Sequence, residues 1–243
     1  MAFPETAPRV PEGTRIYAVG DVHGRADLLG RILAEIERDV TRNPCDDIVE
    51  VFLGDYVDRG PSSQEVLRML QADPAHDGER ICLKGNHEEM VLDFLDDPEL
   101  LVLWMQNGGR PTLQSYGVSP PAEVGRTTIG QARDQLREAL GRDLDFLKKL
   151  KLSHVEGDYL FVHAGIRPGV ALEAQDPEDL MWIREPFLSH AGPLPYFVVH
   201  GHTPVEAPEI KPFRLDIDTG AVASDVLTCL VLEEETRRFL TTG

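Results

Sequence analysis

Five short motifs place metal-binding side chains directly after apolar segments. They occupy residues 19–23 (VGDVH), 53–60 (LGDYVDRG), 84–88 (KGNHE), 162–165 (VHAG) and 199–203 (VHGHT). Their carboxylate, amide and imidazole groups are ligands that hard and borderline divalent metals accept. Because open α/β folds bind ligands at the carboxyl ends of their strands, the motifs predict a metal-centred active site at the carboxyl edge of a sheet.

The first two motifs each offer a carboxylate after a glycine. Asp21 and His23 are two residues apart, so they face the same way and can bind one ion if strand geometry persists, although Asp21 taken alone is more often an N-cap of the following helix. Asp55 could bridge two ions, and a pair ~3.5–4 Å apart is the clamp used in phosphate ester hydrolysis. Arg59 could hold phosphate oxygens bidentately, or it could form a surface ion pair with Asp58.

The third motif combines a ligand with a proton donor. Asn86 offers a neutral oxygen, and the neighbouring His87 imidazole can donate a proton near neutral pH. A carboxylate on the other ring nitrogen would fix the tautomer of His87, and Asp58 is the candidate.

The last two motifs contribute histidines. His163 follows one apolar strand, whereas His200 and His202 follow another and share a face, so periodicity does not choose between them. Together, the donors predict two metal ions in an oxygen and nitrogen site. The three cysteines are widely spaced without a CxxC pair, which disfavours a structural zinc cluster or a disulfide framework and favours a reducing cytoplasm.

In this order, the motifs closely resemble the phosphoprotein phosphatase family of calcineurin-like metallophosphoesterases. Residues 180–185 (LMWIRE) and the short chain make the bacterial and phage-lambda type of serine/threonine phosphatase the nearest match. The resemblance implies an α/β sandwich of two mixed β-sheets flanked by helices.

The resemblance also implies a role for each site residue. The first metal would be held by Asp21, His23 and Asp55, and the second by Asp55, Asn86, His163 and His202, which prefers His202 over His200. His87 would be the general acid, oriented by Asp58, while Arg59 and Arg184 would bind the substrate phosphate. The metals would be two divalent ions, manganese first, with iron, zinc or nickel as alternatives.

The implied reaction is hydrolysis of a phosphomonoester. A hydroxide held by both metals would attack phosphorus directly, and His87 would protonate the leaving alkoxide. We expect a serine/threonine protein phosphatase that acts on a phosphorylated protein or a small phosphate ester. The alternative is a hydrolase of dinucleoside polyphosphates such as diadenosine tetraphosphate. Those relatives typically lack the Asp of Asp-Arg-Gly and carry Asp after Asn-His, so Asp58 and Glu88 favour the phosphatase. A non-enzymatic binding module is disfavoured because every expected ligand is present.

Composition limits the partners. The 243-residue chain carries a formal net charge of −18, which would repel a nucleic-acid backbone. The longest apolar runs fall short of the ~20 residues that would span a bilayer, so no membrane partner is expected. Residues 1–12 lack the apolar core of a signal peptide and read as a loose leader, ahead of a single metallophosphatase domain over residues 13–243.

Hydrophobic periodicity predicts the elements that position the motifs. Strands over residues 15–20, 48–53 and 81–83 alternate with helices over 28–40, 62–70 and 88–95, which predicts a mainly parallel sheet. Ser62 and Glu65 have capping-box spacing. Residues 90–153 read as a helical insertion with a cap at Asp97, a loop from residue 108 to about 125 and a helical stretch over 131–150 that Gly141 could split. Strands over 159–162, 196–199, 213–217 and 226–232 predict a second sheet.

Overall fold

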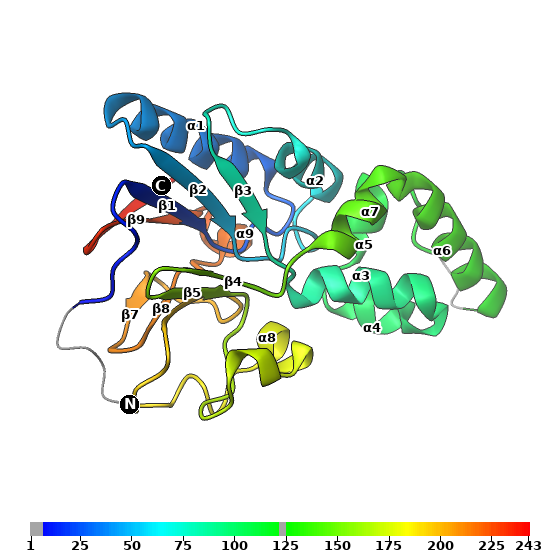
Figure 1. Cartoon of the computed structure of the whole chain (residues 1–243). Coiled ribbons are helices and arrows are strands. Elements are labelled where there is room, and N and C mark those ends of the chain that lie inside the picture. Colours follow the sequence, from blue (N-terminus) through cyan, green and yellow to red (C-terminus); the bar gives the residue numbers. More distant parts are fainter. Residues whose placement is uncertain (1–6, 122–124) are drawn as a thin grey trace.

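The computed structural model describes residues 7–121 and 125–243, and within them two mixed sheets pack face to face (Figure 1). The first sheet has the strand order β10-β9-β1-β2-β3, with β1, β2 and β3 parallel and β9 and β10 antiparallel to their neighbours. Its strands are β1 (Thr14–Val19), β2 (Asp47–Phe52), β3 (Glu79–Cys82), β9 (Thr228–Glu233) and β10 (Thr236–Thr241).

The second sheet has the order β4-β5-β6-β8-β7, in which β5, β6 and β8 are parallel. Its strands are β4 (Ser153–Glu156), β5 (Tyr159–Val162), β6 (Phe197–His200), β7 (Glu209–Ile210) and β8 (Arg214–Asp216).

Helices flank both sheets. In Figure 1, α1 and α2 cover the outer face of the first sheet, α8 lies against the second, and α3 to α7 gather to one side. The bounds are α1 (Ala26–Arg42), α2 (Ser63–Gln71), α3 (Asn86–Asp96), α4 (Leu101–Gln106), α5 (Arg110–Ser115), α6 (Arg126–Leu140), α7 (Arg142–Lys149), α8 (Pro177–Trp182) and α9 (Ala221–Ser224), with single 3₁₀ turns at Pro98–Leu100 and Leu172–Ala174. Among the described residues, no helix combines the length and apolarity needed to cross a membrane.

Alternation along β1 shows how the layers form. Tyr17 and Val19 pack against the helices, whereas Ile16 and Ala18 point into the core between the sheets. Since both faces of the strand are buried, its last four residues, 16–19 (IYAV), form a continuous apolar run. The predicted sandwich of two mixed sheets flanked by helices is confirmed.

One strand lies in a different sheet from the one predicted. Residues 226–232 were expected in the second sheet, but β9 pairs antiparallel with β1, and the unpredicted β10 pairs with β9. Alternating hydrophobic residues indicate a strand and its buried face, but they do not indicate which strand pairs with it.

The helical insertion agrees with the sequence in part. Asp97 accepts a hydrogen bond from the Glu99 N–H at 3.0 Å, and Gly141, with φ of 50°, separates α6 from α7 as predicted. The predicted loop contains α5, and residues 122–124 of it lie outside the described residues. Ser62 precedes α2 without a side-chain cap, so the predicted capping box is wrong. The assignment of residues 90–153 as an insertion stays a prediction.

The expected leader is described only from residue 7. Val10 is fully buried in the core between the sheets, and its N–H donates to the Glu234 carbonyl at 3.0 Å. Residues 1–6 lie outside the described residues.

Candidate metal centre and phosphate site

The donor residues follow parallel strands of both sheets. Asp21 and His23 come after β1, Asp55 after β2, His163 after β5 and His202 after β6. Asn86 and His87 form the first turn of α3, which begins two residues earlier than predicted. The site therefore lies at an edge that the two sheets share, rather than at the edge of one sheet.

The structure brings Asp55 into two groups that could hold a metal ion. One is His23, Asp55 and His87, and the other is Asp55, His163 and His202, with the ligand atoms of each group within 4.8 Å of one another. Asp55 Oδ2 lies 3.4 Å from His23 Nε2, and Asp55 Oδ1 lies 3.4 Å from His163 Nε2. This is the central position that a bridging carboxylate requires.

Asn86 joins the second group. Its Oδ1 lies 3.0 Å from His163 Nε2 and 3.0 Å from His202 Nδ1. By contrast, His200 bonds the Gly201 carbonyl and Arg214, outside both groups. The geometry thus brings His202, and not His200, to the other donors.

The imidazoles present unprotonated nitrogens to this site. His23 Nδ1 donates to the Val57 carbonyl at 2.9 Å, and His163 Nδ1 donates to the Leu53 carbonyl at 3.0 Å, which leaves each Nε2 as an acceptor. Burial lowers the pKa of His23 and of His202 to about 3 and also lowers the pKa of His163. Neutral imidazole is the form that binds metals, so these residues fit a metal ion.

Asp21 belongs to neither of these two groups, and His87 stands in the first group where the resemblance implied Asp21. Its Oδ2 accepts the His202 N–H at 3.1 Å, whereas its buried Oδ1 has no hydrogen-bond partner among the described residues. Burial, followed by the charges of Asp218 and Asp55, raises its pKa well above the ordinary value. Carboxylates that are buried close together repel one another when ionised, and a bound cation would offset that repulsion. Asp21 therefore also fits a metal site.

His87 and Asp58 form a buried pair. His87 Nδ1 lies 2.7 Å from Asp58 Oδ2. Burial alone would lower the pKa of His87, but the carboxylates of Asp55 and Asp58 outweigh it and raise the pKa. A protonated imidazole beside the metal donors can serve as an acid.

The two arginines predicted to bind phosphate, Arg59 and Arg184, differ in their position relative to the donor groups. Arg59 spans the site, with its Nη1 2.8 Å from His23 Nε2 and its Nη2 3.0 Å from His87 Nε2. Arg184 is exposed at the rim, in a cavity of about 530 Å³ that Trp182 also lines. The Trp182 ring centroid is 6.0 Å from that of His202, and the charge of Arg184 contributes to the lowered pKa of His202.

The comparisons with known proteins identify the family. Residues 14–224 match the family model described as calcineurin-like phosphoesterase. The chain belongs to the calcineurin-like phosphoesterases. The metallophosphoesterase relationship predicted from the motifs is therefore confirmed.

Relatives of this phosphoesterase differ in substrate. Serine/threonine-protein phosphatase 1 of Salmonella typhimurium is 28% identical over 225 residues, covering 88% of this chain and 89% of that protein. A symmetrical bis(5'-nucleosyl)-tetraphosphatase of Xanthomonas axonopodis pv. citri is 31% identical over 155 residues, covering 63% of this chain and 40% of that protein. This chain thus spans less than half the length of that tetraphosphatase. The solved structure of a putative diadenosine tetraphosphatase has a TM-score of 0.61 at 19% identity, covering 98% of this chain and 100% of the other, and shows the shared fold.

Left-handed backbone turns aim several side chains of this calcineurin-like phosphoesterase. Positive φ values occur at His23 (45°), Asp55 (51°), Asp58 (70°), Arg59 (66°) and His202 (65°). Non-glycine residues rarely adopt this conformation, which gathers at functional sites. The strand geometry on which the pairing of Asp21 and His23 depended therefore does not persist to His23. Its N–H instead donates to the Asp55 carbonyl at 2.8 Å, which turns the chain toward Asp55.

Glu88 ties the loop after β2 to the start of α3. Its carboxylate is fully buried and accepts the N–H groups of Asp55, Tyr56, Val57 and Gly85 at 2.7–3.2 Å. Burial and the Asp55 charge raise the pKa of Glu88 to about 7, although the N–H groups of Gly85 and Tyr56 act to lower it. The sequence motif contained Glu88, but its structural task was visible only in the fold.

Sequence reasoning also missed Asp218. It is buried after β8, its charge helps raise the pKa of Asp21, and its own pKa is raised to about 6 chiefly by burial. The signal was present in residues 216–220 (DIDTG), which overlap the end of the strand predicted over 213–217 and again place a carboxylate at a strand end.

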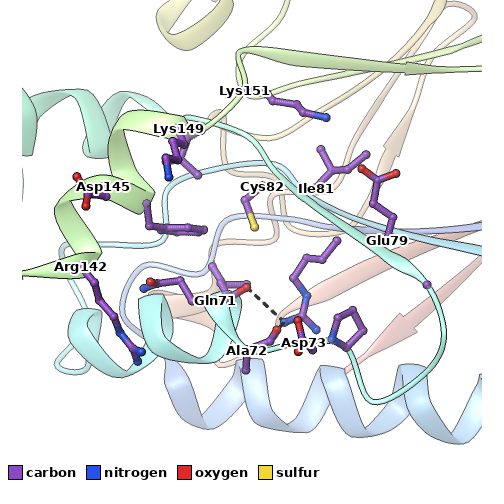
Figure 2. A pocket seen from close by; sticks show the side chains of 16 residues that line it. Gln71, Ala72, Asp73, Glu79, Ile81, Cys82, Arg142, Asp145, Lys149 and Lys151 are labelled. Carbon is purple, nitrogen blue, oxygen red and sulfur yellow. Dashed lines mark hydrogen bonds between the residues drawn. The ribbon is translucent and has the colours of Figure 1, made fainter.

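A cavity of about 790 Å³ lies away from these donors, between the end of α2, β3 and α7 (Figure 2). Its lining includes Asp73, Glu79, Arg142 and Lys149 and none of the predicted site residues. This cavity therefore lies apart from the candidate metal centre.

Proposed function

We propose that this chain is a metal-dependent phosphomonoesterase that removes phosphate from phosphoserine or phosphothreonine in proteins. The observation that supports it best is the buried Asp58–His87 pair, 2.7 Å apart, beside the Asp55 donors. A serine or threonine alkoxide is a poor leaving group and needs a proton as the ester bond breaks. A phosphate group leaving a nucleoside polyphosphate has much less need of one.

The residue roles follow from the donors and their protonation. The first metal would be held by Asp21, His23 and Asp55, and the second by Asp55, Asn86, His163 and His202. Two divalent ions, manganese first, would when bound lower the pKa of a water molecule and neutralise charge on the phosphate. Asp58 holds the Nδ1–H of His87, so that Nε2 can deliver a proton to the leaving oxygen.

The arginines would orient the phosphate. Arg59 already spans His23 and His87 with both terminal nitrogens, a geometry suited to two oxygens of one phosphate. Arg184 would approach from the rim beside Trp182. The Salmonella relative, which aligns over 89% of its own length, further supports a protein phosphatase. The free thiols of Cys45, Cys82 and Cys229 suit a reducing cytoplasm.

The second candidate is a dinucleoside polyphosphate hydrolase that uses the same metals. It is supported by the 31% identity to the symmetrical tetraphosphatase over 155 residues. Side-by-side kinetics on a phosphoserine peptide and on diadenosine tetraphosphate, with the manganese-loaded protein, distinguish the two. We expect the higher kcat/KM on the peptide, and a much higher value on the dinucleotide would overturn this choice.

The same preparation tests whether the chain is an enzyme. A metal-loaded protein that fails to hydrolyse p-nitrophenyl phosphate would instead indicate a binding module on a phosphoesterase scaffold.

A further inference from the structure

Two side chains of the helical insertion hold the Asp58 carboxylate. Trp104 Nε1, on α4, donates to Oδ2 at 2.8 Å, and Thr112 Oγ1, on α5, donates to Oδ1 at 2.6 Å. Trp104 and Thr112 are each only 1% exposed, and Asp58 is fully buried. Both donors therefore act where water does not compete for the carboxylate.

The donors around Asp58 fix the orientation of the His87 ring. An indole N–H can only donate, so Oδ2 of Asp58 accepts from Trp104. Thr112 Oγ1 accepts the Asp58 N–H at 2.9 Å and donates its hydroxyl proton to Oδ1 at 2.6 Å, while the Ser63 hydroxyl lies 2.9 Å from Thr112 Oγ1. A carboxylate can only accept, so the His87 ring nitrogen 2.7 Å away is Nδ1–H. The other ring nitrogen, Nε2, then faces Arg59 and the donor groups.

The backbone next to Asp58 and in the turn between α4 and α5 is also held in place, by a hydrogen bond and by close packing. The Arg59 N–H donates to the Gly108 carbonyl at 2.9 Å, next to Asp58 in its left-handed conformation. A Cβ at Gly109 would fall 2.4 Å from the Trp104 ring, so the chain can pass there only as glycine. The ring also stacks on Phe94, with centroids 5.2 Å apart. These contacts give the Trp104 indole one orientation, with its N–H toward Asp58.

We propose that Trp104 and Thr112 are positioning residues for proton delivery. They hold Asp58 and, through it, hold the His87 imidazole with Nε2 directed at the leaving oxygen. The α4–α5 corner of the insertion thereby belongs to the catalytic apparatus. The inference rests on the proposed function, in which His87 is the acid, and it assigns the insertion a task that the five motifs do not contain.

The test uses Thr112→Val and Trp104→Phe, each of which removes one donor to Asp58. Thr112→Val nearly keeps the side-chain volume, whereas Trp104→Phe keeps an aromatic ring but is smaller. On a phosphoserine peptide we expect kcat to fall ~10-fold or more for each variant, the usual size of a lost orienting hydrogen bond, with little change in KM. On p-nitrophenyl phosphate, whose leaving group needs no proton, we expect a much smaller fall. Thr112→Ser keeps the hydroxyl and should restore the activity toward the peptide. Thr41→Val, at an exposed hydroxyl of α1, is the matched control.

A double-mutant cycle separates positioning from general damage. In a His87→Asn background, Thr112→Val should cost no further activity on the peptide, because its effect passes through His87. Equal losses on both substrates, a failure of Thr112→Ser to rescue, or an additional loss in the His87→Asn background would each overturn the proposal. If a Trp104 variant does not fold, the Thr112 series decides. If the wild-type protein hydrolyses p-nitrophenyl phosphate but neither phosphopeptide nor other alkyl esters, the proposed function fails first, and the positioning role with it.

Discussion

Asp55 and Asp58 are three residues apart on one loop, and both are almost completely buried, yet their surroundings are opposite. Apart from one backbone N–H from His87, Asp55 is faced by ring nitrogens, including the acceptor nitrogens of His23 and His163. Asp58 is faced by the donors of His87, Trp104 and Thr112. The Asp55 carboxylate faces mainly acceptor nitrogens, an arrangement that suits a bound cation. The Asp58 carboxylate has hydrogen-bond donors from the protein on both oxygens. Burial and residue type are shared, so the neighbours decide the role.

The largest expected effect comes from exchanging each carboxylate for its neutral isostere. Asp55→Asn should lose metal binding and ~10³-fold or more in kcat/KM on both alkyl and aryl phosphates, because metals supply several kcal/mol of transition-state stabilisation. Asp58→Asn should keep its metals and lose activity mainly on alkyl phosphates. Metal content by mass spectrometry and kinetics on both ester types measure this. Equal metal loss in both variants would remove the distinction.

His87→Asn tests the acid that Asp58 serves. We expect both metals to remain and kcat on alkyl phosphates to fall ~10²–10⁴-fold, the range for general acids, with less loss on aryl phosphates. The measurement is kcat across esters of graded leaving-group pKa. If the ratio of wild-type kcat to variant kcat is the same for every ester in that series, His87 is not the acid.

The arginines should respond more weakly and unequally. Arg59→Lys removes a fork that reaches both His23 and His87, so we expect ~10–100-fold lower kcat/KM. Arg184→Lys, at the exposed rim, should mainly raise KM, by ~10-fold or less. Steady-state kinetics on one phosphopeptide compare the two variants. Arg38→Lys, at an exposed position of α1, is the control. A larger loss at Arg184 would reverse the order.

The smallest effect is on stability. At a manganese concentration of ~100 times Kd, binding should stabilise the wild-type fold by ~2.7 kcal/mol, which raises Tm by ~5–10 °C for a chain of this size. Asp58→Asn should keep that metal-dependent shift, and Asp55→Asn should lose most of it. Calorimetry with and without a chelator gives both values. A full shift in Asp55→Asn would show that the ions bind elsewhere.

Much of the fold and site could be predicted because the signals are local. The strands β1, β2, β5 and β6 are short and rich in apolar residues, and each is followed within three residues by a predicted metal donor. Parallel strands carry their carboxyl ends to one edge of a sheet, so residues distant in sequence are gathered there without any long-range information. For this reason Asp21, Asp55 and His163 could be named from the sequence, although their assignment as ligands stays a prediction.

The errors share a different cause. The strand at 226–232 was recognised, but its partner β1 lies about two hundred residues earlier, and alternation does not encode pairing. The predicted cap at Ser62 did not form. Its neighbour Ser63 instead bonds the Asp58 N–H and the Thr112 hydroxyl, a tertiary arrangement that local spacing does not show.

By itself, then, the sequence determined the donor types, their order and the strands that deliver them, because side-chain chemistry and periodicity are properties of short segments. The tertiary structure alone decided which donors meet. It brought His202 rather than His200 to Asn86, added Asp218 behind Asp21, and set Trp104 and Thr112 on a carboxylate 46 and 54 residues away. Those contacts depend on left-handed turns and helix packing, whose energies come from neighbours distant in the chain.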